Sequence, residues 1–382
     1  MLRIAHVTSF FDPEYYGSHE YFLSLELQRL GNDITVITSD LHSLWGGALG
    51  LRGKFKCGCH DYDGLRVYRI RSLGRISITP IAHGVLAVLR RGGYDVILTH
   101  ELFHFFSFCS AAAAKNLRKP LLLFLHDYSG GRRPVYKLLF KLNYITLGTF
   151  VLQQADRVVA LSDAAAAFAQ QLGKTPAVVD IIPTGVDLNL FRGCANRTSN
   201  KEEKVILFVG RLTKEKGVFF LLSVFRDIVD AARNVRLLIV GTGPEELSAR
   251  RICTDLHIDD KVYFLGRVNN KSMPTVYEKA DMLVLPTLTS EPFGNVLLEA
   301  MASGIPVIGS AIGGMRDIIV DGENGFKFVP GNAAQLKTRM LTLLRNENLR
   351  MNMGWKARSW VEKRFSWRIV GSRVDTIIKA MC

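Results

Sequence analysis

Residues 3–40 read RIAHVTSFFDPEYYGSHEYFLSLELQRLGNDITVITSD, and this stretch decides the class of fold. RIAHVTSF is a short apolar run that ends in a polar loop, as expected for a strand buried on both faces. EYFLSLELQRLG carries apolar residues at helical spacing and stops at Gly31, and DITVITSD is a second strand-like run. A strand, a helix and a strand in this order predict a parallel sheet with a right-handed crossover.

The same alternation recurs along the whole chain. Further strands are predicted at YDVILTH, PLLLFLHD, DRVVALS and VVDIIPTGVD, with helices between most of them. After the less hydrophobic stretch 191–204, the pattern begins again with KVILFVGRL, VRLLIVGTG, KVYFLGRV, ADMLVLPT, IPVIGSA and GFKFVP. Two successive sets of βα units predict an α/β protein of two doubly wound domains that meet near residue 190. Ligands of such sheets bind at the carboxyl ends of strands, here expected in a cleft between the domains.

Length and composition agree with two folded domains. The chain has 382 residues, of which 48% are hydrophobic and 22% charged, so disordered and fibrous classes are excluded. The first residues hold too short an apolar run for a signal peptide, and no uninterrupted apolar run reaches about 18 residues. We therefore expect a cytoplasmic protein.

The cysteines suggest free thiols in a reducing compartment. Cys57, Cys59 and His60 form a C-G-C-H stretch, but one residue between the cysteines is short of the usual zinc spacing. No second Cys/His pair follows at a suitable distance. No metal site is predicted.

The net charge of +14 is concentrated in the first half of the chain. Between residues 51 and 150, 16 Lys and Arg face 5 Asp and Glu, and the aromatic-laced part of this segment carries Arg132, Arg133, Lys137 and Lys141. An earlier cluster comprises Arg52, Lys54, Lys56, Arg66, Arg69, Arg71 and Arg75. Such a surface is either simply solvated or docks on anionic lipid, where each basic residue contributes on the order of 1 kcal/mol. No nucleic-acid-binding module is visible, so no nucleic acid partner is predicted.

Two basic residues mark a candidate phosphate site in FVGRLTKEKG, residues 208–217. Arg211 and Lys216 follow the carboxyl end of a predicted strand, where Arg could grip a diphosphate with two hydrogen bonds and Lys could act as a point charge. The glycine turn in LIVGTGPEE, residues 238–246, lacks the third glycine of a dinucleotide fingerprint, so NAD is disfavoured.

The segment SEPFGNVLLEA, residues 290–300, places two carboxylates around a predicted helix start. Pro292 disfavours helix at Glu291, and Gly294 permits an unusual turn. If the helix starts near Gly294, the amides of Phe293, Gly294 and Asn295 offer an anion site. Glu299 lies about 7–8 Å further along the axis. A phosphate between two carboxylates suggests a nucleotide sugar, with hydroxyls at both ends.

Several segments together resemble the nucleotide-sugar domain of retaining GT-B glycosyltransferases of family 4, also called glycosyl transferases group 1. They are GRLTKEKG, VGTGPE, FLGRV and TLTSEPFGNVLLEAMASGIPVIGSAIGGMRDIIVDGENGF. The E-x7-E spacing from Glu291 to Glu299 matches the signature of that family. The resemblance is most specific from about 205 to 330 and weaker through 1–190. It implies a GT-B fold with an acceptor-side domain at 1–190, a nucleotide-sugar domain at 191–365 and a last helix at about 366–382 that packs back on the first domain.

The resemblance also implies roles for individual residues. Arg211 and Lys216 would hold the donor diphosphate, Glu299 the ribose, and Glu291 the hydroxyls of the donor sugar, with the three amides near Gly294 assisting. His126 in FLHDY corresponds to the active-site histidine of the family. Gly17 and Ser18 fall where many members carry a Gly-Gly loop near the phosphates and acceptor, and Thr184 stands where Asn is common.

The implied reaction moves a sugar from a UDP-, GDP- or ADP-sugar to a saccharide or lipid-linked acceptor, with retention and without a metal or other cofactor. No D-x-D motif lies near a ligand cluster. The product is expected to serve cell-surface polysaccharide or glycolipid synthesis, with peripheral attachment at the inner face of the membrane. Three alternatives stay open: a sugar-nucleotide epimerase of the same fold, an NAD-dependent oxidoreductase, and an inactive glycosyltransferase-like scaffold.

Overall fold

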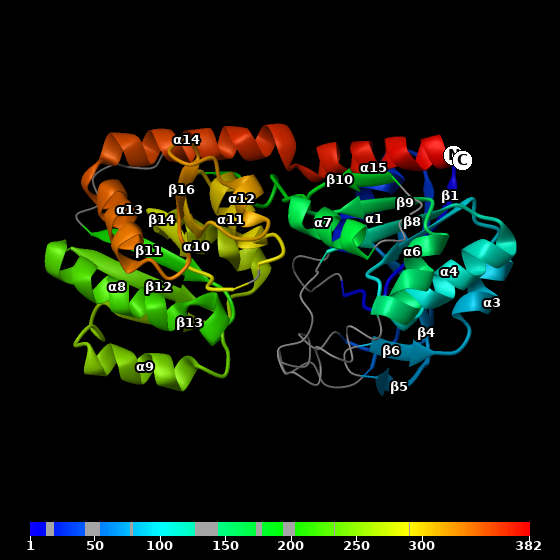
Figure 1. Ribbon diagram of the computed structural model, residues 1–382, viewed down its shortest axis with the longest axis horizontal. Helices are drawn as coiled ribbons and strands as arrows, with labels where there is room; N and C mark the ends of the chain where they lie inside the picture. Colours follow the sequence, from blue (N-terminus) through cyan, green and yellow to red (C-terminus); the bar gives the residue numbers. More distant parts are fainter. Residues whose placement is uncertain are drawn as a thin grey trace. The chain divides into compact units, whose positions relative to one another are not determined.

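The computed structural model describes residues 1–12, 19–42, 54–76, 79–126, 144–172, 178–193, 203–232, 234–289 and 291–382. The chain folds into two compact units, each built on its own sheet (Figure 1). The first unit comprises Met1–Gly185 and Trp367–Cys382, and the second comprises Val186–Ser366. Within the described ranges, no helix is both long and apolar enough to cross a bilayer.

The first unit contains an eight-stranded sheet in the order β10-β9-β8-β7-β1-β2-β4-β3. All neighbouring pairs are parallel except β3 and β4. Its elements are β1 Arg3–Val7, α1 His19–Arg29, β2 Asp33–Ser39, β3 Gly58–Tyr62, β4 Leu65–Ile70, β5 Ser72–Ile76, β6 Thr79–Ala82, α3 Val85–Gly92, β7 Val96–His100, α4 Phe105–Leu117, β8 Leu121–Leu125, η1 Tyr144–Gly148, α6 Thr149–Gln154, β9 Arg157–Ala160, α7 Asp163–Gln171, β10 Val178–Ile181 and α15 Trp367–Met381.

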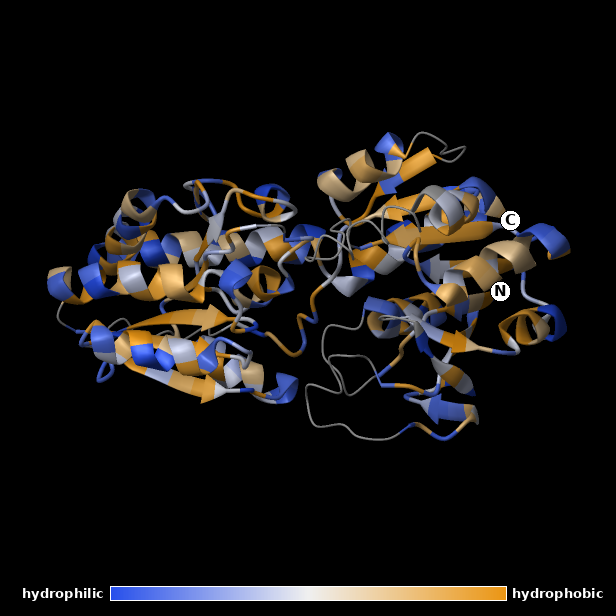
Figure 2. Ribbon diagram, turned by 60° about the horizontal axis from the view of Figure 1, so that its bottom comes forward, coloured by the Kyte–Doolittle hydropathy of each residue, from blue (hydrophilic) through white to orange (hydrophobic). Residues whose placement is uncertain are grey.

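Strand pleating divides the core of the first unit into two layers. In β8, Leu121 and Leu123 pack with α3, α4 and α6, whereas Leu122 and Phe124 pack with α1 and α15. Successive side chains of a strand point to opposite faces, so an uninterrupted apolar run such as LLLFL fills both layers. Figure 2 shows most strands of the two sheets coloured as hydrophobic, while many helices carry both colours.

The second unit contains a six-stranded sheet in the order β13-β12-β11-β14-β15-β16, with every pair parallel. Its elements are β11 Lys204–Val209, η2 Lys214–Lys216, α8 Val218–Ala231, β12 Val235–Val240, α9 Glu246–Asp255, β13 Val262–Gly266, η3 Asn270–Ser272, α10 Met273–Lys279, β14 Met282–Leu285, α11 Asn295–Ala302, β15 Val307–Ser310, α12 Met315–Ile318, β16 Gly325–Phe328, α13 Ala333–Arg345 and α14 Glu347–Arg364. Residues of α8, α9 and α13 form one hydrophobic core with the strands.

The chain passes from one unit to the other at Gly185 and Val186, and returns at Ser366 and Trp367. Val186 donates its backbone N–H to the carbonyl of Phe365 at 2.8 Å and forms a parallel bridge with Ser366. These bonds tie Val186 to the end of the second unit, a few residues before the boundary predicted near residue 190. Past Ser366, α15 returns to the first unit, where Asp375 Oδ1 accepts a hydrogen bond from Asn32 Nδ2 at 2.7 Å.

Part of the basic segment after residue 51 forms strands, and one of its basic residues is not on the surface. β3 and β4 extend the main sheet, and β5 and β6 form a separate two-stranded sheet. Arg69, predicted as part of a basic surface cluster, is 1% exposed. Its guanidinium donates to the carbonyls of Phe11 at 2.8 Å and Ser39 at 3.4 Å and lies over the ring of Phe55. The prediction was wrong for this residue, since its charge is used inside the fold.

Candidate active site

The candidate donor site lies at the point where the strand order of the second sheet reverses. β11 pairs with β12 on one side and with β14 on the other, so the crossovers leave in opposite directions. Ligands of open α/β sheets bind at such a switch point, beyond the carboxyl ends of the strands. The loop after β11 carries Arg211 and Lys216, and the loop after β14 leads to Glu291 and α11.

Close backbone contacts hold these two loops together. Leu288 donates its N–H to the carbonyl of Glu215 at 2.8 Å. Gly217 has a φ of 74°, and a Cβ there would lie 2.0 Å from the carbonyl oxygen of Pro286. Only glycine fits both the left-handed conformation and this approach. The geometry therefore requires the glycine that ends the KEKG turn.

Lys216 and Glu291 form an ion pair between the two loops. The ammonium of Lys216 contacts Oε2 of Glu291, and the hydroxyl of Thr287 lies 3.4 Å from the same oxygen. Glu291 is 7% exposed, so its carboxylate depends on these partners rather than on water. The structure thus brings together two of the predicted site residues. Arg211, on the same loop as Lys216, is exposed.

Helix α11 begins as the sequence predicts, with Gly294 as the residue before its first turn. Gly294 has a φ of 91°, and its carbonyl accepts from the N–H of Leu297 at 2.8 Å. Asn295 is exposed, whereas the side chain of Phe293 is buried. The first amides of a helix lack intrahelical partners and carry the positive end of the helix dipole, which suits an anionic ligand.

Glu299 is held by a partner that the sequence analysis did not identify. Its Oε2 accepts a hydrogen bond at 2.8 Å from the hydroxyl of Tyr277 on α10, and both residues are buried. Tyr277 reads as an ordinary apolar helix position in the sequence. The hydrogen bond sets the orientation of one carboxylate oxygen of Glu299 and leaves acceptor capacity on the carboxylate.

Two glycines allow close backbone contacts between loops at the carboxyl end of this sheet. A Cβ on Gly241, in the GTG turn after β12, would lie 1.9 Å from the carbonyl oxygen of Gly210. A Cβ on Gly314 would lie 2.5 Å from the carbonyl oxygen of Pro292, and the N–H of Gly314 donates to the carbonyl of Glu291 at 3.2 Å. In the sequence, the first glycine turn is a weak dinucleotide signal and one of the segments that resemble the family. Gly314 was missed, although the Gly-Gly pair in SAIGGM marks it as a tight turn.

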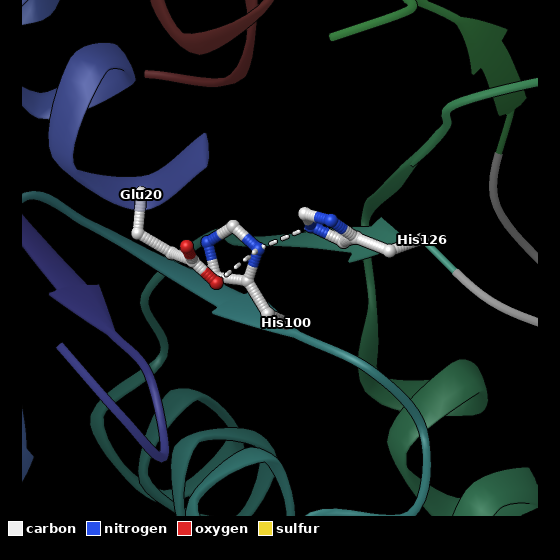
Figure 3. Close-up of side chains that lie close together, drawn as sticks. All are labelled: Glu20, His100 and His126. Carbon is white, nitrogen blue, oxygen red and sulfur yellow. Dashed lines mark hydrogen bonds and ion pairs between the residues drawn. The ribbon is translucent and has the colours of Figure 1, made fainter. Parts of the chain in front are cut away.

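A cluster of histidines occupies the corresponding switch point of the first sheet, where β1 lies between β7 and β2. Pleating places His6, His100 and His126 on the face that also carries Phe124. His6 Nε2 lies 2.6 Å from His100 Nε2, and His100 Nδ1 lies 2.8 Å from His126 Nε2. Figure 3 shows His100 between His126 and Glu20, whose Oε1 is 4.0 Å from His100 Nδ1.

Burial keeps these imidazoles uncharged. Desolvation, with the field of His126 as a smaller cause, lowers the pKa of His6 to about 3. Desolvation lowers the pKa of His126 to about 4 and that of His100 well below 6.5. At neutral pH each ring therefore has one N–H and one lone pair.

The folded protein is expected to lose stability as the pH falls from 7 to 5. The pKa of His6, at which half of the rings are protonated, is 6.5 in the unfolded chain and about 3 in the folded protein. Over this window the unfolded state binds more protons, so His6 alone lowers the free energy of unfolding by about 2 kcal/mol. Urea unfolding of the full chain at both pH values tests this, with His6→Gln expected to show a correspondingly smaller loss. An identical loss in that variant would contradict the assignment.

Glu20, His100 and His126 are also a group that could in principle hold a metal ion, because their ligand atoms lie within 4.8 Å of one another. Two ring nitrogens bound to one tetrahedral zinc are about 3.3 Å apart, given Zn–N distances of 2.0–2.1 Å. The 2.8 Å between His100 Nδ1 and His126 Nε2 is instead the length of a hydrogen bond. The cluster therefore fits a hydrogen-bonded chain better than a metal site.

Some predicted features lie outside the described residues. They include Gly17, Ser18, Arg52 and the basic, aromatic-laced stretch with Arg132, Arg133, Lys137 and Lys141. Cys57 and Cys59 are free and exposed, and Thr184 is buried with its hydroxyl 3.4 Å from His19 Nδ1.

Both halves of the sequence match known glycosyltransferase families. Residues 195–360 match the family model Glycosyl transferases group 1, and residues 17–190 match Glycosyltransferase Family 4. An uncharacterized glycosyltransferase of Methanocaldococcus jannaschii is 28% identical over 99% of this chain and 98% of its own. The capsular polysaccharide biosynthesis glycosyltransferase CapM of Staphylococcus aureus is 31% identical over 50% of this chain and 52% of its own. The structure of Anabaena HepE in complex with UDP has a TM-score of 0.79 at 20% identity, covering 99% of this chain and all of its own.

Two Rossmann-like units give the chain a GT-B fold, and the two family matches make it a glycosyltransferase. The two family matches lie one on each unit and together cover most of the sequence. The chain belongs to the family 4, or group 1, glycosyltransferases.

Proposed function

We propose that this chain is a retaining, metal-independent hexosyltransferase that moves a sugar from a nucleoside diphosphate sugar to a saccharide or lipid-linked acceptor. The observation that carries the proposal is the arrangement around Gly294. On one side of α11's first turn Glu291 is paired with Lys216, and within the helix Glu299 is held by Tyr277. Anion-binding amides between two buried carboxylates suit a diphosphate with hydroxyl-bearing groups at both ends.

The donor would be held along this arrangement. The diphosphate contacts Arg211, Lys216 and the amides near Phe293, Gly294 and Asn295, while Glu299 accepts hydrogen bonds from the ribose. Glu291 accepts hydrogen bonds from the hydroxyls of the donor sugar. HepE, of similar fold, has been crystallised with UDP-glucose, which supports a nucleotide-sugar donor for this chain.

Transfer breaks the bond between the anomeric carbon and the phosphate oxygen, and the electron pair goes to the diphosphate. The acceptor oxygen bonds to the anomeric carbon on the same face, and its proton passes to a phosphate oxygen of the leaving group. Arg211, Lys216 and the helix amides stabilise the negative charge, and the carboxylate of Glu291 stabilises the positive charge on the sugar ring. These cations could supply the charge neutralisation for which other transferases use a metal, so we propose that no cofactor is needed.

His126 is proposed as the catalytic residue contributed by the first unit. It directly follows β8, and its Nε2 lies 2.8 Å from His100 at the end of β7, which borders the switch point of the sheet. Substrate groups of α/β proteins are bound at such points. Gly17 and Ser18 are proposed to line the phosphate and acceptor loop, on the basis of the family resemblance.

The acceptor is proposed to belong to cell-surface polysaccharide or glycolipid synthesis, as the name of CapM suggests for that relative. The enzyme is proposed to be cytoplasmic and to work at the anionic inner face of the membrane through its basic N-terminal region, in which 16 Lys and Arg face 5 Asp and Glu between residues 51 and 150.

Glu299→Gln is expected to weaken binding of the nucleoside diphosphate by roughly tenfold or more, because a charge-assisted hydrogen bond contributes about 1.5–3 kcal/mol. Titration calorimetry with UDP, GDP and ADP measures this. Tyr277→Phe removes the hydrogen bond that orients Glu299, together with a longer contact to the carbonyl of Val296 at 3.4 Å, but keeps the carboxylate, and should weaken binding less. Unchanged affinity in Glu299→Gln would refute the ribose assignment.

A further inference from the structure

Three histidines and one serine of the first unit form a single hydrogen-bonded chain. Ser24 Oγ lies 2.7 Å from His6 Nδ1, and His6 Nε2 lies 2.6 Å from His100 Nε2. His100 Nδ1 then lies 2.8 Å from His126 Nε2. The chain uses both ring nitrogens of His6 and His100, so neither ring has a nitrogen left for another partner.

Because each ring is neutral, the protons of the chain must all point the same way. A neutral imidazole that donates through one nitrogen accepts through the other. The N–H groups therefore run either from His6 toward His126 or from His126 toward His6. In the first arrangement His126 carries its proton on Nδ1, and in the second it carries it on Nε2.

The serine at one end of the hydrogen-bonded chain selects the first arrangement. Ser24 is fully buried on α1, and among the described residues His6 is the one hydrogen-bond partner of its hydroxyl. A buried hydroxyl hydrogen without an acceptor costs about 1–3 kcal/mol, so Ser24 donates to His6 Nδ1. His6 then donates to His100 through Nε2, and His100 donates to His126 through Nδ1.

Among the charged and titratable neighbours, Glu20 favours the same direction and the others do not oppose it. The carboxylate of Glu20 is 4.0 Å from His100 Nδ1 and attracts a proton to that nitrogen. Glu101 binds the backbone N–H of His126 at 3.2 Å through Oε1. Of the other nearby histidines, His19 and His104 have pKa values lowered by burial, so they add no charge near neutral pH.

We propose that Ser24, His6 and His100 are positioning residues that hold His126 as the tautomer protonated on Nδ1, so that His126 donates a hydrogen bond to a substrate oxygen. Within the described part of the chain, Nδ1 of His126 has no hydrogen-bond partner of its own. A sugar hydroxyl or a phosphate oxygen is the chemistry that this N–H would recognise. The proposal rests on the proposed function only for the claim that His126 contacts substrate, and it makes His126 a hydrogen-bond donor instead of a general base.

The tautomer is measured directly by nitrogen NMR of the full chain labelled with ¹⁵N-histidine, with signals of His126 assigned by their loss in His126→Gln. The expected spectrum at pH 7 has a protonated Nδ1 and an unprotonated Nε2. The opposite tautomer would overturn the proposal, whatever the enzyme's activity.

Two buried serines provide a matched pair of variants. Ser24→Ala removes the hydroxyl at the end of the hydrogen-bonded chain. Ser110→Ala removes an equally buried hydroxyl, which donates to the backbone carbonyl of Phe106 at 2.8 Å. Ser24→Ala should populate the second tautomer of His126 detectably and lower kcat by roughly threefold to tenfold, as expected for one lost hydrogen bond. Ser110→Ala should leave the tautomer unchanged. Equal tautomer populations in both variants would contradict the proposed role of Ser24.

Kinetics separate this proposal from the proposed function. A neutral donor predicts that kcat of the wild type shows no histidine limb between pH 6 and 8, whereas a general base would produce one. If the Nδ1 tautomer is found but His126→Gln keeps full kcat, the role of His126 in transfer is wrong and the hydrogen-bonded chain stands. If His126→Gln loses activity but the wild-type tautomer is reversed, the role of His126 in transfer stands and the proposed direction of the hydrogen-bonded chain is wrong.

Discussion

Glu291→Gln is expected to lower kcat for sugar transfer by about 10²–10³-fold while changing the affinity for the nucleoside diphosphate little. The substitution keeps the shape of the side chain but removes the negative charge that faces the developing positive charge of the sugar ring. It also leaves Lys216 without the carboxylate that it contacts at the end of β14's loop. The loss should therefore be in the chemical step, and steady-state kinetics with saturating donor measures it.

Two other carboxylates serve as controls for Glu291→Gln. Glu299→Gln should show the opposite pattern, with weakened nucleotide binding and a smaller effect on kcat at saturation. Glu323→Gln, on the exposed turn before β16, should behave as the wild type. Wild-type kcat in Glu291→Gln, with the fold intact by circular dichroism, would refute the catalytic assignment.

Gly241→Ala is expected to destabilise the second unit by about 2–5 kcal/mol, the sum of a left-handed backbone penalty and an overpacked contact. Gly241 has a φ of 126°, and the added Cβ would lie 1.9 Å from the carbonyl oxygen of Gly210. Relief of that clash must move the turn that precedes Arg211. Weaker diphosphate binding should therefore accompany the lower thermal midpoint.

Gly266→Ala is the matched control for Gly241→Ala. Gly266 also has a positive φ, of 65°, but a Cβ there would meet nothing within 4 Å. Only the backbone penalty of roughly 1–2 kcal/mol should remain, with donor affinity unchanged. Equal destabilisation in the two variants, measured by urea unfolding, would mean that the contact between the two turns is unimportant.

The sequence predicted the two sheets well because their strands are unbroken apolar runs. The prediction missed strands that have charged residues among the apolar ones. LRVYRI of β4 buries Leu65 and Val67 and exposes Arg66 and Tyr68. The next buried position is occupied by Arg69, so the apolar–polar alternation of the sequence breaks although the alternation of burial continues. Helix α14 was missed for a similar reason, since its buried side includes Arg350, Gly354 and Ala357 in place of large apolar residues.

The predictions for the two switch points differ in what local sequence can show. Glu291, Gly294 and Glu299 lie within one short segment, so helix geometry alone relates them. His6 and His100 are interior and terminal residues of separate strands, and they meet because β1 lies beside β7. Strand order depends on tertiary packing of the whole unit and is not encoded in either segment. Tyr277 meets Glu299 for the same reason, from a different helix.

The central claim is that the second unit binds a nucleoside diphosphate sugar for transfer. The most direct measurement follows nucleoside diphosphate release from UDP-, GDP- and ADP-sugars in EDTA, with a lipid-linked saccharide in anionic or neutral vesicles as acceptor. We expect one nucleotide to be selected and to raise the thermal midpoint, and we expect release to rise with acceptor, most in anionic vesicles. NMR of the product should show a retained anomeric configuration. Stabilisation by none of the nucleotides, or by NAD instead, would contradict the account.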